Sequence, residues 1–224
     1  MTATLIKNNS DVYSVSTWTH YAEVFSSVMT SVQLEVYKAT CLHLTGNVVD
    51  FGCGTAKIAP FLADNPKVIS YTGVDYAEDM VKRAQQVFQT IGKPNYTAQH
   101  RKIEDAQGCY SSAVSIQSYY AWSNPIETLK HIYTLLEDKA LFVLATPNKS
   151  LQLETLAKEI EKELIGHPNL QAYKEYNLKL AANPDAHFIN MGELSHQVQQ
   201  AGFQIIEAHQ HFFNGGINFI VMEK

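Results

Sequence analysis

The stretch VVDFGCGTAK at residues 48–57, followed by the pair VD at residues 74–75, decides the fold class of this chain. An apolar strand that runs into a glycine-rich turn is where α/β proteins hold a nucleotide-like ligand, and an acid at the end of the next strand suits a ribose. Glycine permits positive φ and a close approach of backbone to the ligand, and the helix that follows presents free NH groups to it. The stretch therefore predicts an α/β protein with a nucleotide-like ligand at this turn.

The spacing of the small residues separates two kinds of site. A dinucleotide-binding turn reads G-x-G-x-x-G/A, which requires a small residue at position 57, where this chain has Lys57. Asp50 and Ala56 give the spacing D-x-G-x-G-x-A instead. This pattern resembles the first motif of class I S-adenosylmethionine-dependent methyltransferases, and YTGVDYAEDMVKRA at residues 71–84 resembles their second. Lys57, which replaces the small residue of a dinucleotide-binding turn, also disfavours a nicotinamide-dependent oxidoreductase.

The resemblance implies an α/β, Rossmann-like class I methyltransferase fold. Such a fold has a seven-stranded, mostly parallel sheet with an antiparallel last strand and helices on both faces. We expect a helical cap at residues 1–46, a methyltransferase core at residues 47–147 and 192–224, and a helical lid at residues 148–191. The cofactor implied is S-adenosyl-L-methionine, with S-adenosyl-L-homocysteine as its product.

The resemblance also implies roles for residues that match the motifs. Backbone at Gly52 and Gly54 would pass under the methionine portion of the cofactor, with Asp50 directed toward its amino group. Asp75 would accept both ribose hydroxyls, since one carboxylate can accept several hydrogen bonds. An ordinary strand-to-helix turn is the alternative for the glycines, and a plain surface acid is the alternative for the adenine-side candidates. The full set of cofactor-binding candidates is Asp50, Gly52, Cys53, Gly54, Asp75, Tyr76, Met80, Glu104, Asp105 and Gln117.

Length and composition favour a single catalytic domain, and the charge disfavours a large polyanionic partner. The chain has 224 residues, of which 46% are hydrophobic, and its net charge is −5. This charge argues against a nucleic-acid partner, because such binding depends on Lys and Arg neutralising phosphates. The three cysteines are widely spaced, so neither a disulfide framework nor a metal site is indicated. No signal-like or membrane-spanning run is recognised, so we expect no membrane association and a cytoplasmic location.

Apolar periodicity predicts the elements outside the motifs. A three- and four-residue repeat predicts one helix over residues 17–44, and a second stripe predicts a helix from Leu153 to Leu164. A further helix is expected over residues 169–182. This helical pair forms either a lid over the acceptor pocket or a dimer contact, so both a monomer and a homodimer stay open. The chain is expected to close with a strand at 203–212 and its antiparallel partner at 218–222.

Candidates for a base or an acceptor-orienting group come from segments that overhang the pocket in this topology. An in-line methyl transfer from a sulfonium needs alignment and exclusion of water, and a hydroxyl acceptor would also need a base. Aromatic side chains can hold a cation by cation-π attraction. These candidates are His20, Tyr21, Tyr119, Tyr120, His187 and His211.

We therefore expect transfer of a methyl group to a nitrogen or oxygen of a small-molecule metabolite. The alternatives are a non-catalytic cofactor-binding or interaction protein of the same fold and a protein side-chain methyltransferase.

Overall fold

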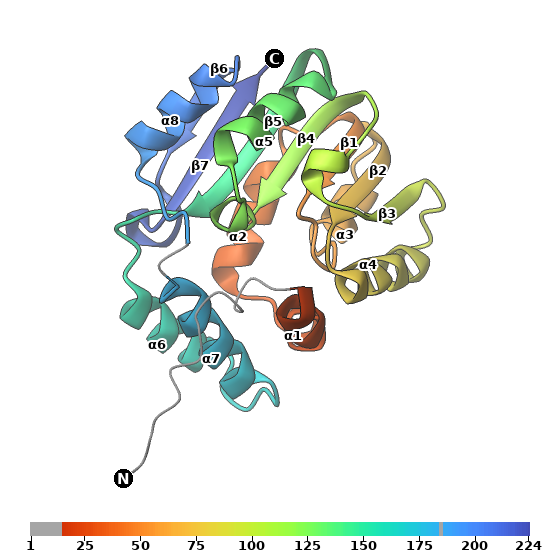
Figure 1. The fold of residues 1–224 in the computed structure, drawn as a ribbon. Helices are drawn as coiled ribbons and strands as arrows, with labels where there is room; N and C mark the ends of the chain where they lie inside the picture. Colours follow the sequence, from red (N-terminus) through yellow and green to blue (C-terminus); the bar gives the residue numbers. More distant parts are fainter. Residues whose placement is uncertain (1–14, 184–185) are drawn as a thin grey trace.

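A seven-stranded sheet forms the centre of the molecule (Figure 1). The computed structural model describes residues 15–183 and 186–224, and at residues 15–17, 19, 20 and 181 it describes the backbone only. The strands are β1 (Gly46–Phe51), β2 (Val68–Asp75), β3 (Tyr96–His100), β4 (Tyr110–Ile116), β5 (Leu136–Pro147), β6 (Gln204–His209) and β7 (Ile217–Glu223). Their order is β3-β2-β1-β4-β5-β7-β6. β7 runs antiparallel to β5 and β6, whereas the other neighbours pair in parallel, so the predicted sheet is confirmed.

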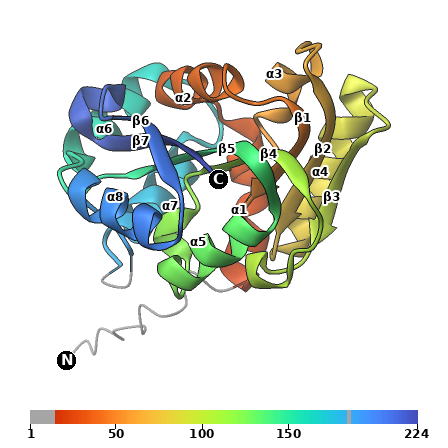
Figure 2. The same cartoon turned by 90° about the horizontal axis from the view of Figure 1, so that it is seen from above.

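Helices cover both faces of the sheet. In the described residues they are α1 (Val15–Ser27), α2 (Ser31–Cys41), α3 (Ala59–Ala63), α4 (Glu78–Ile91), α5 (Pro125–Thr134), α6 (Leu153–Glu163), α7 (Leu170–Ala181) and α8 (Met191–Gln200). Figure 2 shows α2 and α3 on one side of the sheet and α5 and α8 on the other. The molecule is thus a three-layer α/β sandwich, with α1, α6 and α7 below the sheet in Figure 1.

The two sides of the sheet carry separate apolar cores because successive side chains of a strand point to opposite faces. On β1, Val48 belongs to the core formed with α2, α3 and α4. Its neighbour Val49 belongs to the core formed with α5 and α8. Both valines are fully buried, as expected for a parallel strand covered by helices on both faces.

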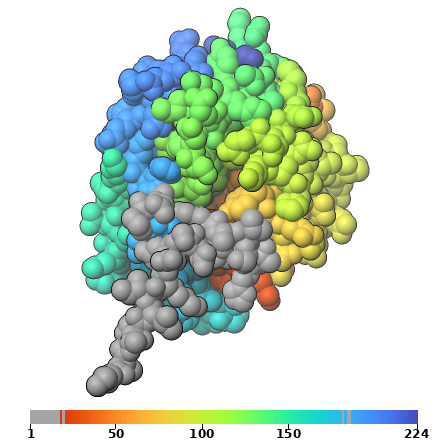
Figure 3. Space-filling view, viewed as in Figure 1, coloured from red at the N-terminus to blue at the C-terminus, as the bar shows by residue number. Residues whose placement is uncertain are grey.

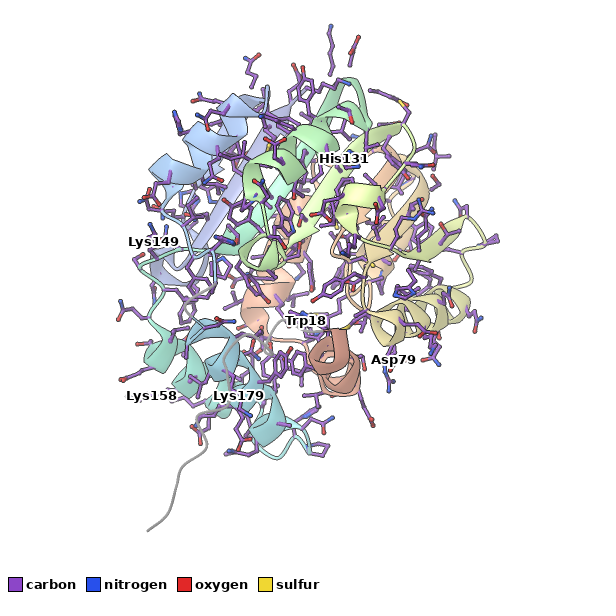
Figure 4. All side chains as sticks on the ribbon, in the orientation of Figure 1. Trp18, Asp79, His131, Lys149, Lys158 and Lys179 are labelled. Carbon is purple, nitrogen blue, oxygen red and sulfur yellow. The ribbon has the colours of Figure 1, made fainter. Side chains whose placement is uncertain are left out.

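A third apolar cluster holds α1, α6 and α7 together. Tyr21, Ile160 and Tyr173 contribute to it from these three helices, and each is buried. The charged residues of α6 and α7 lie on the outside, as Figure 4 shows for Lys158 and Lys179. The inner faces of these helices are therefore apolar and aromatic.

The predicted single helix at residues 17–44 is wrong, because the chain forms α1 and α2 with a break at residues 28–30. Thr30 is the N-cap of α2, and its hydroxyl accepts a hydrogen bond from the backbone NH of Gln33 at 3.3 Å. The Gln33 side chain accepts in return from the backbone NH of Thr30 at 3.1 Å. This capping box satisfies NH groups at a helix start, so the local sequence favours a new helix over continuation.

Other boundaries shift by a few residues. The strand expected at residues 203–212 ends at His209 and is followed by a short 3-10 turn, Phe212–Gly215. After β3 ends at His100, Ile103–Asp105 forms a second 3-10 turn.

Among the described helices, none has the length and apolar character needed to cross a bilayer.

Candidate functional site

A cavity of about 1140 Å³ lies where the strands β1, β2 and β4 end. Ligands of open α/β sheets bind outside the carboxyl ends of the strands. Helices α1, α2, α6 and α7 supply the opposite wall. Figure 3 shows the surface of this side of the molecule, with the segments after β3 and β4 in yellow-green and green above the teal surface of α6. The volume lies just above the usual range of about 300–1,000 Å³ for ligand pockets.

The glycine turn after β1 forms part of the cavity wall. Gly52 has φ +75° and Gly54 has φ +53°, and residues other than glycine are strained at such positive φ values. A Cβ atom on Gly52 would lie 2.4 Å from the Cβ of Ser118. The Ser118 hydroxyl donates to the carbonyl oxygen of Phe51 at 3.0 Å, which joins the turn after β1 to the turn after β4. Both the backbone angle and this close approach require glycine at position 52.

Asp75 at the end of β2 is held in place by backbone. Its Oδ2 accepts from the NH of Gly54 and its Oδ1 from the NH of Ala77, both at 2.8 Å. Burial raises the pKa of Asp75, and backbone hydrogen bonds from Ala77, Gly54 and Tyr76 oppose the shift. A carboxylate has about four lone-pair sites, so Asp75 keeps some capacity to accept a hydrogen bond from a hydroxyl group of a ligand in the cavity.

Asp50 at the carboxyl end of β1 is the second buried carboxylate of the cavity. Its Oδ2 accepts a hydrogen bond of 2.6 Å from the hydroxyl of Tyr71. Burial raises the pKa of Asp50 from 3.8 to about 7, and the nearby charge of Asp75 adds to the shift, whereas the Tyr71 hydrogen bond lowers it. A ligand cation next to Asp50 would favour its ionised form.

The other cofactor candidates also line the cavity, so all ten residues predicted to bind the cofactor lie in its wall. Cys53 and Met80 are buried, and Tyr76 and Gln117 are half-buried. Glu104 and Asp105 are exposed at the mouth, and Glu104 accepts a hydrogen bond of 3.2 Å from the hydroxyl of Thr128.

The predicted catalytic residues separate into two groups. Tyr21, Tyr120 and His187 line the cavity. Tyr119 does not, because it is fully buried in the core and its hydroxyl donates to Oε1 of Gln197 at 2.6 Å. His211 does not line it either, since it lies at the surface with its ring stacked on His209. His20 belongs to α1, but its side chain lies outside the described residues.

Tyr21 sits in an aromatic part of the wall. Its ring stacks on Tyr176 with centroids 3.6 Å apart and planes 7° apart. Its hydroxyl accepts a hydrogen bond of 3.0 Å from the side-chain amide of Asn177. Burial is the main cause that raises the pKa of Tyr21, so this hydroxyl is neutral and able to donate.

Sequence reasoning missed several residues of the cavity wall. Phe25, Tyr37 and Tyr173 line it from α1, α2 and α7. The helical periodicity of the sequence assigned Phe25 to core packing and gave no role to Tyr37 or Tyr173. Both tyrosines are buried, and a periodic pattern does not show whether a buried side chain also faces a cavity. Lys57 lines it too, although the sequence used this residue only to reject a dinucleotide site. A lysine between apolar residues at the start of a helix was the available signal.

Charge divides the cavity into two parts. In the described residues, α1, α2, α6 and α7 contribute no charged side chain to the wall. All of the charged lining residues come from the strand ends, the loops that follow them and the start of α5: Asp50, Lys57, Asp75, Lys102, Glu104, Asp105 and Glu127. We call the first part the helical wall and the second the strand-end wall. Across the described residues, no three His, Cys, Asp or Glu side chains gather in a way that could hold a metal ion.

The chain matches the family described as "Methyltransferase domain" over residues 31–208. A search of curated protein sequences found no match. Among solved structures, the chain is similar to the cyclopropane synthase MmaA2 from Mycobacterium tuberculosis, with a TM-score of 0.68, 12% identity, and coverage of 99% of this chain and 100% of that one.

Two further structures show the same similarity. Magnesium protoporphyrin IX methyltransferase from Synechocystis PCC 6803 with bound SAM has a TM-score of 0.66 and 13% identity, with 100% of both chains covered. A SAM-dependent methyltransferase from Aquifex aeolicus has a TM-score of 0.62 and 12% identity, with 97% of this chain and 98% of that one covered. At such identities the likeness concerns the fold.

Proposed function

This chain belongs to the methyltransferase domain family and is S-adenosylmethionine-dependent, and from that premise we propose that it methylates a nitrogen or oxygen of a small, largely apolar molecule. The observation that carries the proposal is the division of the cavity into a charged strand-end wall and an uncharged, aromatic helical wall. The first suits the polar cofactor, and the second suits an apolar acceptor.

The strand-end wall has the polar groups that the cofactor needs. We assign the buried carboxylate of Asp75 to the ribose hydroxyls and that of Asp50 to the amino group. Gly52 and Gly54 let the backbone pass close beneath the methionine portion. Glu104 and Asp105 lie at the exposed mouth, where we assign the adenine.

The helical wall aligns the acceptor. The cofactor supplies a methyl group that its sulfonium already activates, so the protein must mainly orient the acceptor atom and exclude water. Tyr21 and Tyr120 present aromatic surfaces, and His187, which is exposed and lines the cavity, is the imidazole assigned to accept a proton from a hydroxyl. Tyr119 and His211 have no part in this proposal, because neither lines the cavity.

We assign the lid role to residues 148–191, with residues up to 46 as the cap. The supporting observation is that α6 and α7 turn apolar side chains such as Ile160 and Tyr173 toward the cavity and the helix α1. A cytoplasmic location and a monomeric or homodimeric state stay predictions from the sequence.

A labelled-cofactor experiment tests the function. The protein is incubated with methyl-labelled S-adenosylmethionine and a metabolite extract, and label is followed into small molecules and into protein. Label in small molecules is the expected result. Label only in protein would favour a side-chain methyltransferase, and binding of the cofactor without any transfer would favour a non-catalytic protein; either outcome overturns the proposal.

A substitution at Asp75 tests the cofactor half of the site. We expect Asp75→Asn to weaken binding of S-adenosylhomocysteine about 10- to 100-fold, because a carboxylate is a stronger acceptor than an amide. Calorimetric titration measures the affinity. Asp79→Asn is the control, since Asp79 lies on the outside of α4 and pairs with Lys82 at 3.1 Å (Figure 4). Equal affinities for Asp75→Asn and the control would contradict the assignment.

A further inference from the structure

Lys57 is a buried lysine in the wall of the cavity. It follows the glycine turn, lines the cavity and is only 8% exposed. Its Nζ donates to the carbonyl oxygen of Val28 and lies 3.6 Å from the centroid of the Phe25 ring. No carboxylate of the described residues forms an ion pair with it.

These partners do not fully replace the hydration that the buried ammonium group of Lys57 has lost. The group has three N–H donors, and one carbonyl oxygen accepts only one of them. The face of Phe25 attracts the cation but carries no negative charge. Removing a charge from water is costly unless an opposite charge replaces the lost hydration. Burial accordingly lowers the pKa of Lys57 from 10.5 to about 7. An anion that entered the cavity would supply the missing partner.

The position of Lys57 in the cavity indicates which anionic group of a ligand it would meet. Phe25, whose ring Lys57 covers, also reaches the glycine turn, since a Cβ atom on Gly54 would lie 3.3 Å from its ring. Lys57 is therefore a close neighbour of the turn over which the methionine portion of the cofactor is assigned. That portion carries one carboxylate beside its amino group, and the other charged residues near the turn, Asp50 and Asp75, are both acidic.

We propose that Lys57 binds the carboxylate of the methionine portion of the cofactor, while Asp50 receives the amino group. This inference rests on the proposed function. The two side chains, one on each side of the glycine turn in the sequence, would pair with the two opposite charges of one amino acid group. Lys57 is then a specificity residue that selects a cofactor with an intact carboxylate.

A purely structural role for Lys57 makes a different prediction. Val28 follows the carboxyl end of α1, where backbone carbonyls lack helical partners, so a lysine can stabilise this end as a cap. Such a cap would affect stability and every ligand alike. A lysine that binds a carboxylate distinguishes ligands that differ only in that group.

The test compares two ligands on two variants. Calorimetric titration measures binding of S-adenosylhomocysteine and of decarboxylated S-adenosylhomocysteine, which keeps the amino group. We expect Lys57→Met to weaken binding of the first compound about 10- to 100-fold and of the second less than about 3-fold, as for the loss of one hydrogen-bonded charge pair. Lys57→Arg keeps the positive charge and should restore most of the preference for the carboxylate.

Controls separate the possible failures. Lys82→Met removes an exposed lysine of α4 that pairs with Glu78 and Asp79, and it should bind both compounds as the unchanged protein does. Thermal unfolding of each unliganded variant verifies that it folds. If the unchanged protein binds neither compound, the proposed function itself fails. If it binds both and Lys57→Met weakens the two equally or neither, the function stands and the role of Lys57 is overturned. If Lys57→Met binds S-adenosylhomocysteine as the unchanged protein does but no longer transfers a methyl group, Lys57 would act on an anionic group of the acceptor. That result would also overturn the role proposed for Lys57.

Discussion

Burial alters the charge state of two residues that face the cofactor side of the cavity. It raises the pKa of Asp50 and lowers the pKa of Lys57, each to about 7. Desolvation is the main cause in both cases, because the charged form of either group loses its hydration. Burial thus tends to neutralise both groups, and a ligand with an amino group and a carboxylate would favour their charged forms.

Asp50 should make the stability of the unliganded protein depend on pH. Its pKa is about 7 in the folded protein and near 3.9 in an unfolded chain, so the folded state holds an extra proton between these values. Its contribution to the free energy of unfolding is therefore complete below about pH 4 and is lost as the pH rises to about 7. Asp50→Asn should remove a slope of at most about 1.4 kcal/mol per pH unit over this window. Urea unfolding at several pH values measures the slope, and an unchanged slope in the variant would contradict the prediction.

Substitution of Gly52 separates two reasons for glycine at this position: the positive φ and the lack of space for a Cβ atom. Gly52→Ala meets both a φ of +75° and a Cβ contact of 2.4 Å with Ser118. Gly166→Ala meets a φ of +81° with no atom within 4 Å, so it isolates the backbone term. We expect Gly166→Ala to lower the free energy of unfolding by about 1 kcal/mol and Gly52→Ala by about 2–4 kcal/mol. Chemical denaturation measures both, and equal losses would show that the close approach has no effect.

At the scale of elements, the break between α1 and α2 shapes the site. The carbonyl of Val28 in this break accepts from Lys57, and Thr30 and Gln33 line the cavity beside it. An unbroken helix would use such carbonyls in its own hydrogen bonds. The capping box at Thr30 therefore stabilises a bend that exposes a polar group where the cavity needs one.

Thr30→Ala should destabilise the start of α2. The hydroxyl that accepts from the NH of Gln33 is lost, and a missing N-cap lowers the free energy of unfolding by about 1 kcal/mol. Thr90→Ala is the matched control, because its hydroxyl bonds the carbonyl of Gln86 on the exposed side of α4. Chemical denaturation of both variants measures the difference. A loss in the control as large as that in Thr30→Ala would exclude the capping explanation.

At the scale of the whole molecule, one buried amide connects both ends of the segment 148–191 to the sheet. Asn218 on β7 accepts a hydrogen bond from the side chain of Asn148 at 2.7 Å and donates to the carbonyl of Ile189 at 2.7 Å. It also accepts from Gln210 at 3.1 Å. The antiparallel β7 lies between β5 and β6, so the position of α6 and α7 over the strand ends depends on this last strand.

Asn218→Ala should loosen the segment at both ends. Buried polar groups of Asn148 and Ile189 would lose their partner, and we expect the free energy of unfolding to fall by about 2–4 kcal/mol. Amide hydrogen exchange should increase across α6 and α7 more than across β1 and β4. Exchange that increased evenly over the molecule would show that Asn218 stabilises the fold without specifically anchoring the segment.

The motif at residues 48–57 and the later Asp75 were sufficient to predict the sheet, the glycine turn and the two buried acids of the strand-end wall, Asp50 and Asp75, but not Lys57, Lys102 or Glu127 of the same wall. They are sufficient because this chemistry is local: a strand end, a glycine turn and the next strand end lie side by side whenever the parallel order is kept. The helical wall was predicted less well. Tyr119 and Tyr120 are neighbours in the same short turn, yet only Tyr120 lines the cavity. No periodicity separates them, because the difference is set by packing against α8 on one side and by the lid segment on the other.

The sequence by itself therefore determined the fold class and the donor half of the site, since each depends on contacts between segments close in the chain or paired in one sheet. Only the tertiary structure decided that Lys57 contacts the break between α1 and α2, which tyrosines reach the cavity and how α6 and α7 cover the strand ends. These features depend on contacts between residues of different elements that lie far apart in the chain, such as the hydrogen bond between Tyr21 and Asn177. Such contacts form when apolar faces pack together, and an apolar stripe does not specify its partner.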